Sequence, residues 1–134
     1  MVISRVLISE EEIAKRVKEM AKQISEDYKG KDVFVVTIMK GAMIFTADLV
    51  RNLSVPVTMD FMAVSSYGSA TESSGVVRIL RDLEESVEGK HVLLVEDIID
   101  TGLTLKYLTE NLRSRGVASL KICVLLDKPE RRKT

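Results

Sequence analysis

The sequence is poor in several residue types, and each scarcity excludes a class of protein. Its 134 residues include one cysteine, Cys123, and one histidine, His91, and no tryptophan. One cysteine excludes an internal disulfide, and so few histidines and cysteines exclude a zinc site built from them. No apolar run approaches the roughly 20 residues that a membrane-spanning helix needs, and the N-terminus lacks the apolar core of a signal peptide. We therefore expect a cytoplasmic protein that does not bind a membrane.

An excess of charge of one sign is also absent. The 20 basic and 20 acidic residues cancel, so no bulk field draws the chain to nucleic acid or to an anionic membrane. The length predicts a single core domain over 1–134. Cys123 lies in an apolar run and is expected to be a buried, unreactive thiol. His91 lies far in sequence from the acidic residues discussed below and is expected at the surface.

Apolar periodicity predicts alternating helices and strands without a repeat. Ser9 and Glu12 form a capping-box pattern, and an apolar stripe at helical spacing follows them. Strands are expected over 33–38, 57–64, 76–80, 91–95 and 119–126, and later helices over about 42–52 and from 103 to a C-cap near Gly116. Residues 65–75 are rich in serine and glycine and are expected to form a mobile loop. This order predicts an α/β fold, a mainly parallel central sheet with helices on both faces.

The most informative segment is Val92–Leu105, with the sequence VLLVEDIIDTGLTL. Its apolar run predicts a buried strand, and Glu96 and Asp97 follow at the carboxyl end, where open α/β sheets bind ligands. The turn after Asp100 opens a helix whose N-terminus favours an anion, and Gly102 permits a tight bend and close approach of a ligand. Carboxylates accept hydrogen bonds from a vicinal diol or bind a metal. The segment therefore predicts a site for a sugar phosphate.

Three other interpretations of this segment fit the sequence less well. Such a turn before a helix is often simple capping, but two further acids at the end of an apolar strand make that interpretation weaker. Aspartic proteases use Asp-Thr-Gly in all-β domains that carry a second copy, whereas this chain alternates strands and helices and has one copy. A P-loop requires Gly-Lys-Ser/Thr after a longer glycine-rich run, and the sequence has none.

Val92–Leu105 resembles the phosphoribosyl-pyrophosphate signature of the purine phosphoribosyltransferases, most closely that of the hypoxanthine-guanine branch. Three further segments follow the family's order. Ile38–Gly41 resembles its pyrophosphate loop, Val64–Gly68 its mobile lid, and Leu125–Lys128 the strand end with its purine-reading lysine. The likeness covers essentially the whole chain, and the phosphoribosyl motif is its specific part. The resemblance implies a type I phosphoribosyltransferase fold, which is Rossmann-like.

The resemblance also implies a reaction and a set of site residues. A 5-phosphoribosyl group would pass from phosphoribosyl pyrophosphate to hypoxanthine or guanine, giving pyrophosphate and a purine nucleoside monophosphate, IMP or GMP. The implied contacts are Glu96, Asp97, Asp100, Thr101, Gly102, Leu103 and Thr104 for ribose and phosphate, Lys40, Gly41, Ser66 and Tyr67 for pyrophosphate, and Ile98 and Lys128 for the purine. Asp100 is the expected general base. Mg²⁺ is the expected cofactor, bound by Glu96 and Asp97 directly or through ribose hydroxyls.

The end of the sequence departs from the family pattern. Members continue past the lysine strand with a segment that supplies a stacking aromatic and a further aspartate, whereas this sequence stops at Thr134 and its last aromatic is Tyr107. We therefore expect a C-terminally shortened core with a polar end at 127–134. An alternative function stays open, a nucleotide-binding core with weak or no turnover. An RNA-binding regulator is less favoured, because it would need a basic face.

The family further implies a homodimer or homotetramer. The apolar helix expected at 42–52 and the Phe61-Met62 pair offer surface for such an association, although both are equally compatible with an ordinary core.

Overall fold

The computed structural model of the 134-residue chain describes residues 9–39, 41–67, 76–99 and 102–127. The elements within these residues are α1 (Glu10–Asp27), β1 (Val33–Met39), α2 (Met43–Arg51), β2 (Val57–Tyr67), β3 (Val76–Arg81), β4 (His91–Ile99), α3 (Leu103–Arg113) and β5 (Ser119–Asp127). Strands and helices alternate along most of the chain, as the periodicity predicted. Among the helices described here, none combines the length and apolar character needed to cross a membrane.

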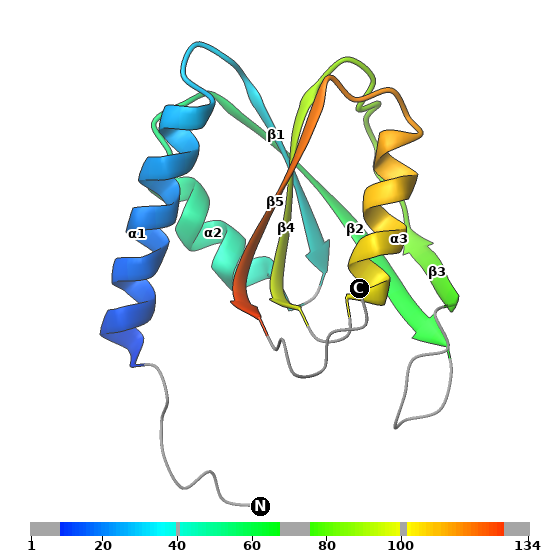
Figure 1. Cartoon of the computed structure of the whole chain (residues 1–134), viewed down its shortest axis with the longest axis horizontal. Coiled ribbons are helices and arrows are strands. Elements are labelled where there is room, and N and C mark those ends of the chain that lie inside the picture. The colour runs from blue at the N-terminus through cyan, green and yellow to red at the C-terminus, as the bar shows by residue number, and fades with distance from the viewer. Residues whose placement is uncertain (1–8, 40, 68–75, 100–101, 128–134) are drawn as a thin grey trace, which may run out of the picture.

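The strands form one sheet in the order β3-β2-β1-β4-β5. β1 pairs in parallel with β2 and with β4, and β4 pairs in parallel with β5, whereas β3 pairs antiparallel with β2. Because four strands run the same way, their carboxyl ends meet at one edge, at the bottom of Figure 1, where α2 and α3 also begin. The predicted mainly parallel sheet is confirmed.

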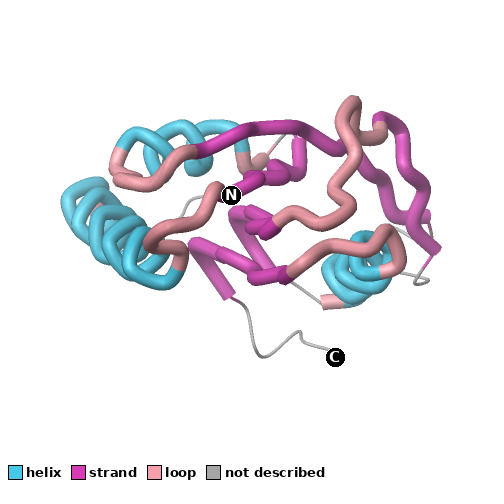
Figure 2. The backbone as a smooth tube through the Cα atoms, turned by 90° about the horizontal axis from the view of Figure 1, so that it is seen from above, coloured by secondary structure: helices cyan, strands magenta, loops and turns pink. Residues whose placement is uncertain are grey.

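Helices cover both faces of the sheet, as predicted. Figure 2 shows α1 and α2 on one side and α3 on the other. Along β1 the side chains alternate between two cores: Val33 and Val35 pack with α1 and α2, and Phe34 and Val36 pack with α3. A strand covered on both faces favours apolar residues at every position, which explains why this central strand is apolar throughout except at Thr37.

The helix boundaries follow the sequence signals closely. Ser9 is the N-cap of α1, and its Oγ accepts a hydrogen bond from the Glu12 amide at 3.1 Å. α2 lies inside the predicted range 42–52, and α3 begins at Leu103 as expected. The predicted C-cap was wrong by two residues: the C-cap of α3 is Ser114, while Gly116, at φ +80°, ends the turn that follows.

Two strands run further than their apolar patterns indicated. β2 continues through Tyr67 because its last residues pair with β3 up to Tyr67↔Val76. β4 continues through Ile99 because it pairs with β5 up to Ile99↔Asp127. The predicted loop at 65–75 therefore begins too early, and its residues 68–75 lie outside the described residues. Backbone pairing extends each strand into polar residues, where hydrophobic periodicity carries no signal.

The sole histidine and the sole cysteine both lie against the core of the fold. His91, expected at the surface, is half-buried: its Nδ1 lies 2.8 Å from Ser119 Oγ, and its ring meets the Tyr28 ring edge-on at 6.4 Å between centroids. The prediction that Cys123 is buried is confirmed, because the residue is 6% exposed. Burial raises the pKa of the Cys123 thiol to about 11, so it carries almost no reactive thiolate near neutral pH.

A buried carboxylate holds the connection that leads into β4. Asp60 in β2 is 4% exposed. Its Oδ2 accepts hydrogen bonds from the amides of Glu84 at 2.9 Å and Glu85 at 3.1 Å, and its Oδ1 accepts from the Phe61 amide at 2.7 Å. Partly buried backbone amides in a connection need such acceptors. Asp60 thus fixes how the chain enters the strand that carries the predicted sugar-binding acids.

Replacing Asp60 with alanine should destabilise the fold. Asp60→Ala leaves two partly buried amides without their acceptor, so we expect the free energy of unfolding to fall by about 1–3 kcal/mol. Urea denaturation followed by circular dichroism measures the change. Asp32→Ala, at an exposed carboxylate just before β1, is the matched control and should stay within about 0.5 kcal/mol of the parent chain. Equal losses in the two variants would contradict the anchoring role.

Candidate active site

The carboxyl edge of the sheet brings together segments that are far apart in the sequence. β1 ends at Met39 and β4 at Ile99, and these strands are neighbours through the parallel register Phe34↔Val92 to Thr37↔Val95. β5 ends beside β4 at Asp127. The predicted pyrophosphate turn, the acidic segment and the strand leading to the predicted purine lysine therefore reach the same edge (Figure 1). Lys40, Asp100, Thr101 and Lys128 themselves lie outside the described residues.

Glu96 lies within the last residues of β4, not after its end. Val92 and Leu94 belong to the core under α3, and side chains two residues apart share one face of a strand. Glu96 is half-buried and continues that row, so its side chain lies on the face of the sheet that α3 covers. Asp97 and Ile98 follow it in the strand. Their backbone reaches the edge as predicted, but their side chains are outside the described residues.

The start of α3 is a helix N-terminus that begins after a glycine. Gly102 is the N-cap, and its φ of +86° lies in the left-handed region. Only glycine adopts this conformation without strain. The helix dipole gives this end partial positive charge. Leu103 and Thr104 form the first helical positions and are half-buried.

A second helix begins at the same edge. Gly41 and Ala42 directly precede α2, and Ala42 is its N-cap. The Ala42 amide donates to the Ile38 carbonyl at 3.3 Å, which closes the connection into a tight turn. Because both α2 and α3 start here, two positive helix ends lie at the edge where anionic groups would bind.

The two predicted lid residues occupy the end of β2. Ser66 and Tyr67 pair with Val77 and Val76 of β3, and β2 runs parallel to β1, so both residues reach the carboxyl edge. Their backbone is therefore strand, which corrects the expectation of a loop from residue 65. Their side chains are outside the described residues, so their contact with pyrophosphate stays a prediction.

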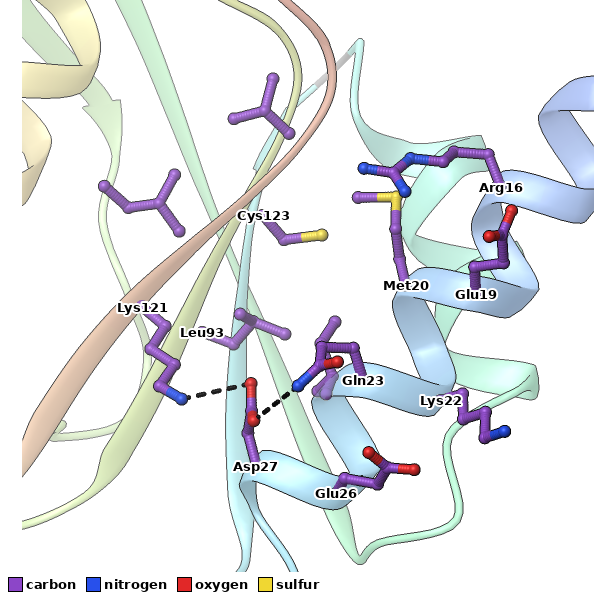
Figure 3. A pocket seen from close by; sticks show the side chains of 13 residues that line it. Arg16, Glu19, Met20, Lys22, Gln23, Glu26, Asp27, Leu93, Lys121 and Cys123 are labelled. Carbon is purple, nitrogen blue, oxygen red and sulfur yellow. Dashed lines mark hydrogen bonds and ion pairs between the residues drawn. The ribbon is translucent and has the colours of Figure 1, made fainter.

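A hollow of about 760 Å³ lies elsewhere, between α1 and the edge strand β5. Figure 3 shows Lys121 and Gln23 converging on Asp27, with Lys121 Nζ 3.3 Å from Asp27 Oδ2 and Gln23 Nε2 2.9 Å from Asp27 Oδ1. The Gln23 hydrogen bond, helped by Lys121, holds the pKa of Asp27 below its usual value. None of the predicted site residues lines this hollow. The predicted site therefore lies at the carboxyl edge of the sheet and not in this hollow.

The oxygen donors at the edge suit magnesium shared with a substrate. In the described part of the chain, no group of three or more His, Cys, Asp or Glu side chains could hold a metal alone. Mg²⁺ typically takes one or two protein carboxylates and completes its shell with substrate phosphates and water. Glu96, half-buried in β4, supplies one such carboxylate. The expected contribution of Asp97 depends on a side chain outside the described residues and stays a prediction.

One buried polar pair close to the carboxyl edge of the sheet was not predicted from the sequence. Thr37 Oγ1 in β1 donates to Thr46 Oγ1 in α2 at 3.2 Å, and both residues are buried. The sole sequence signal was a threonine within an otherwise apolar strand, which is also an ordinary β-branched strand residue.

Comparisons with known proteins identify the family of the chain. The family model described as "Phosphoribosyl transferase domain" matches residues 7–134. The chain belongs to the phosphoribosyltransferase family. The resemblance inferred from Val92–Leu105 is therefore confirmed, and the relatives described next identify the branch.

Two curated relatives are named hypoxanthine-guanine phosphoribosyltransferase. The protein from Mycobacterium tuberculosis strain H37Rv is 49% identical over 134 residues, covering 96% of this chain and 66% of its own length. The protein from Bacillus subtilis strain 168 is 51% identical over 131 residues, covering 98% of this chain and 73% of its own length. This chain thus spans about two thirds to three quarters of these phosphoribosyltransferases.

A solved structure confirms the fold. The crystal structure of a hypoxanthine phosphoribosyltransferase from Staphylococcus aureus superposes with a TM-score of 0.94 at 48% sequence identity, covering 98% of this chain and 72% of that one. The type I phosphoribosyltransferase architecture predicted from the sequence is therefore correct over the part of the chain that the structure describes.

Proposed function

We propose that the chain catalyses a purine-salvage reaction, the transfer of a 5-phosphoribosyl group from phosphoribosyl pyrophosphate to hypoxanthine or guanine. The products are pyrophosphate and IMP or GMP. One observation carries the proposal: β4 brings Glu96 and Asp97 directly to the start of α3 at Gly102, beside the turn between β1 and α2. Relatives that carry this activity in their names support it. The cytoplasmic location stays a prediction.

The edge separates contacts for the two anionic ends of the substrate from contacts for its sugar. The N-terminus of α3, from Thr101 to Thr104, would bind the 5′-phosphate. Lys40 and Gly41 before α2 would bind pyrophosphate, with Ser66 and Tyr67 closing over it to exclude water. Glu96 and Asp97 would accept hydrogen bonds from the ribose hydroxyls. When bound there, Mg²⁺ would supply positive charge to the phosphate oxygens of the substrate.

The remaining groups would manage the purine. Departure of pyrophosphate leaves oxocarbenium character at the anomeric carbon, and purine N9 forms the new bond. Asp100 would take the proton from N7 as general base. Ile98 would pack near the base, and Lys128 would donate to the exocyclic O6. Adenine offers an amino group there, which leaves the lysine ammonium without an acceptor, so adenine should be rejected.

A pyrophosphate-release assay tests the proposed activity. With phosphoribosyl pyrophosphate and Mg²⁺, we expect release in the presence of hypoxanthine or guanine and none above background with adenine; xanthine completes the panel. Binding of GMP without any release would instead support the alternative of a nucleotide-binding core, which no comparison favours. A response to adenine equal to that for guanine would contradict the role of Lys128.

Substituting the proposed general base should separate chemistry from binding. Asp100→Asn keeps the shape of the side chain but cannot accept the N7 proton as a carboxylate does, so we expect turnover to fall by roughly a hundredfold or more. The affinity for GMP, measured by calorimetry, should change little. Asp32→Asn, at an exposed position before β1, is the control. Near-normal turnover in Asp100→Asn would remove this residue from the role.

We also propose that the chain forms a homodimer or homotetramer through the exposed face of α2. Ile44 is 77% exposed and Met43 51% exposed in the first turn of this helix. Met59, 37% exposed in β2, is the register partner of Val35, whose side chain packs on the α1–α2 face. Large aliphatic side chains gathered on one face typically mark an association surface. Met62, by contrast, is fully buried core, so the expectation that it offers surface was wrong.

An acidic substitution should weaken this association. We expect the parent chain to scatter light as a dimer or larger species at micromolar concentration, and Ile44→Glu to shift it toward monomer. An acid in the first helical turn is compatible with the helix dipole, so folding should be retained. Leu80→Glu, at a 60% exposed position on β3, controls for added surface charge. A parent chain that is monomeric throughout the range would contradict the proposal.

A further inference from the structure

Two threonine hydroxyls are buried together behind the turn that joins β1 to α2. Thr37 is 0% exposed and Thr46 is 1% exposed. Thr37 Oγ1 donates to Thr46 Oγ1 at 3.2 Å. Thr37 lies two residues before the end of β1, and Thr46 lies in the first half of α2. The pair therefore links the last part of the strand to the beginning of the helix.

Core packing alone does not account for these hydroxyls. β1 is buried from Val33 to Ile38, and at such positions valine has the shape of threonine without the cost of burying a polar group. The two hydroxyls satisfy each other, and neither is among the buried polar atoms left without a partner in the described residues. What they add over an apolar contact is direction, because a hydrogen bond restricts distance and angle whereas apolar packing does so weakly.

The direction of this hydrogen bond matters because Thr37 and Thr46 flank the turn between β1 and α2. The Ile38 carbonyl accepts from the Ala42 amide at 3.3 Å, and the Ala42 carbonyl accepts from the Thr46 amide at 2.9 Å. The turn through Gly41 is thus closed by a backbone bond at its base. The hydroxyl pair adds a second link, one residue further back on the strand and one helical turn further along α2, which sets how α2 lies against β1.

We propose that Thr37 and Thr46 are positioning residues that aim the N-terminus of α2 and the Gly41 turn at the pyrophosphate of the substrate. This inference rests on the proposed phosphoribosyltransferase function. Both side chains are buried, so they act through the backbone they hold and not by touching the substrate. Preorganised N–H groups bind an anion well only when their direction is fixed before the ligand arrives. The pair should therefore affect pyrophosphate-bearing ligands and leave the 5′-phosphate site at α3 unaffected.

Valine substitutions can separate positioning from folding. Thr37→Val or Thr46→Val alone leaves the partner hydroxyl buried and unpaired, which destabilises the fold, whereas the double variant replaces both partners by apolar groups of the same shape and should recover most of that stability. The double variant is therefore the informative one. Thr37→Ser keeps the hydroxyl and should retain ligand affinity. Thr109→Val removes a hydroxyl that donates to the Leu105 carbonyl at 2.7 Å within α3, and is the matched control on the other helix.

Calorimetric titration with two ligands gives the decisive comparison. In the double variant we expect the Kd for phosphoribosyl pyrophosphate to rise about three- to tenfold, the equivalent of one net hydrogen bond. The Kd for GMP, which carries no pyrophosphate, should not change, and the unfolding midpoint should stay near that of the parent. In turnover assays the same defect should appear in KM for phosphoribosyl pyrophosphate more than in kcat.

The possible contrary results have different meanings. An unchanged Kd for phosphoribosyl pyrophosphate in the double variant, with the parent binding both ligands, would overturn this inference and leave the proposed function standing. Equal weakening of both ligands would overturn it as well, because the pair would then act on the whole fold. A parent chain that binds neither ligand would overturn the proposed function, and the inference with it.

Discussion

Parallel pairing of β1 with β4 is the constraint on which the rest of the structure depends. The register Phe34↔Val92 to Thr37↔Val95 places the two strand ends at one edge, although the turn after β1 and the acidic end of β4 are far apart in the sequence. A shift of one residue would exchange the faces of every side chain in a strand. It would also take Glu96 away from the face that α3 covers. The register is held by residues buried on both faces, Val35 and Leu93 on the face of α1 and α2 and Val36 and Leu94 on the face of α3.

The proposed site combines two kinds of polarity. Two helix N-termini carry partial positive charge from backbone dipoles, and in the proposal the carboxylates at the end of β4 would accept hydrogen bonds from hydroxyl groups. A sugar with a phosphate group at each end needs positive charge at its two ends and hydrogen-bond acceptors for the hydroxyl groups between them. The buried threonine pair extends this picture inward, since the direction of a helix N-terminus depends on how the helix is held by the strand behind it. Asp60 acts comparably on the chain that enters β4.

The sequence predicted the fold well where apolar periodicity was strong. The buried runs of β1 and β4, the capping box at Ser9 and the start of α3 were all correct. Strand ends were wrong at Tyr67 and Ile99, because backbone ladders continue through serine and acidic residues that carry no hydrophobic signal. The partial burial of His91 was not predicted, because its packing partner, Tyr28, comes from a distant helix end, which no local pattern reveals.

The structure describes the backbone of part of the candidate site. The motif at Val92–Leu105 predicted acids at the carboxyl end of a strand and a glycine bend before a helix that begins near Leu103. The structure agrees, and it adds that Gly102 is the N-cap and that Glu96 is half-buried. The roles of Asp97, Asp100, Lys40 and Lys128 depend on where their side chains point, so they stay predictions. The Thr37–Thr46 bond could not have been predicted, because it arises only when α2 folds back on β1.

The most direct test of this account is a crystal structure of the chain with GMP. The account predicts the 5′-phosphate at the N-terminus of α3 beside Gly102, with the ribose hydroxyls toward Glu96 and Asp97. Nucleotide bound in the hollow between α1 and β5, or a phosphate away from Gly102 with those carboxylates facing elsewhere, would contradict it.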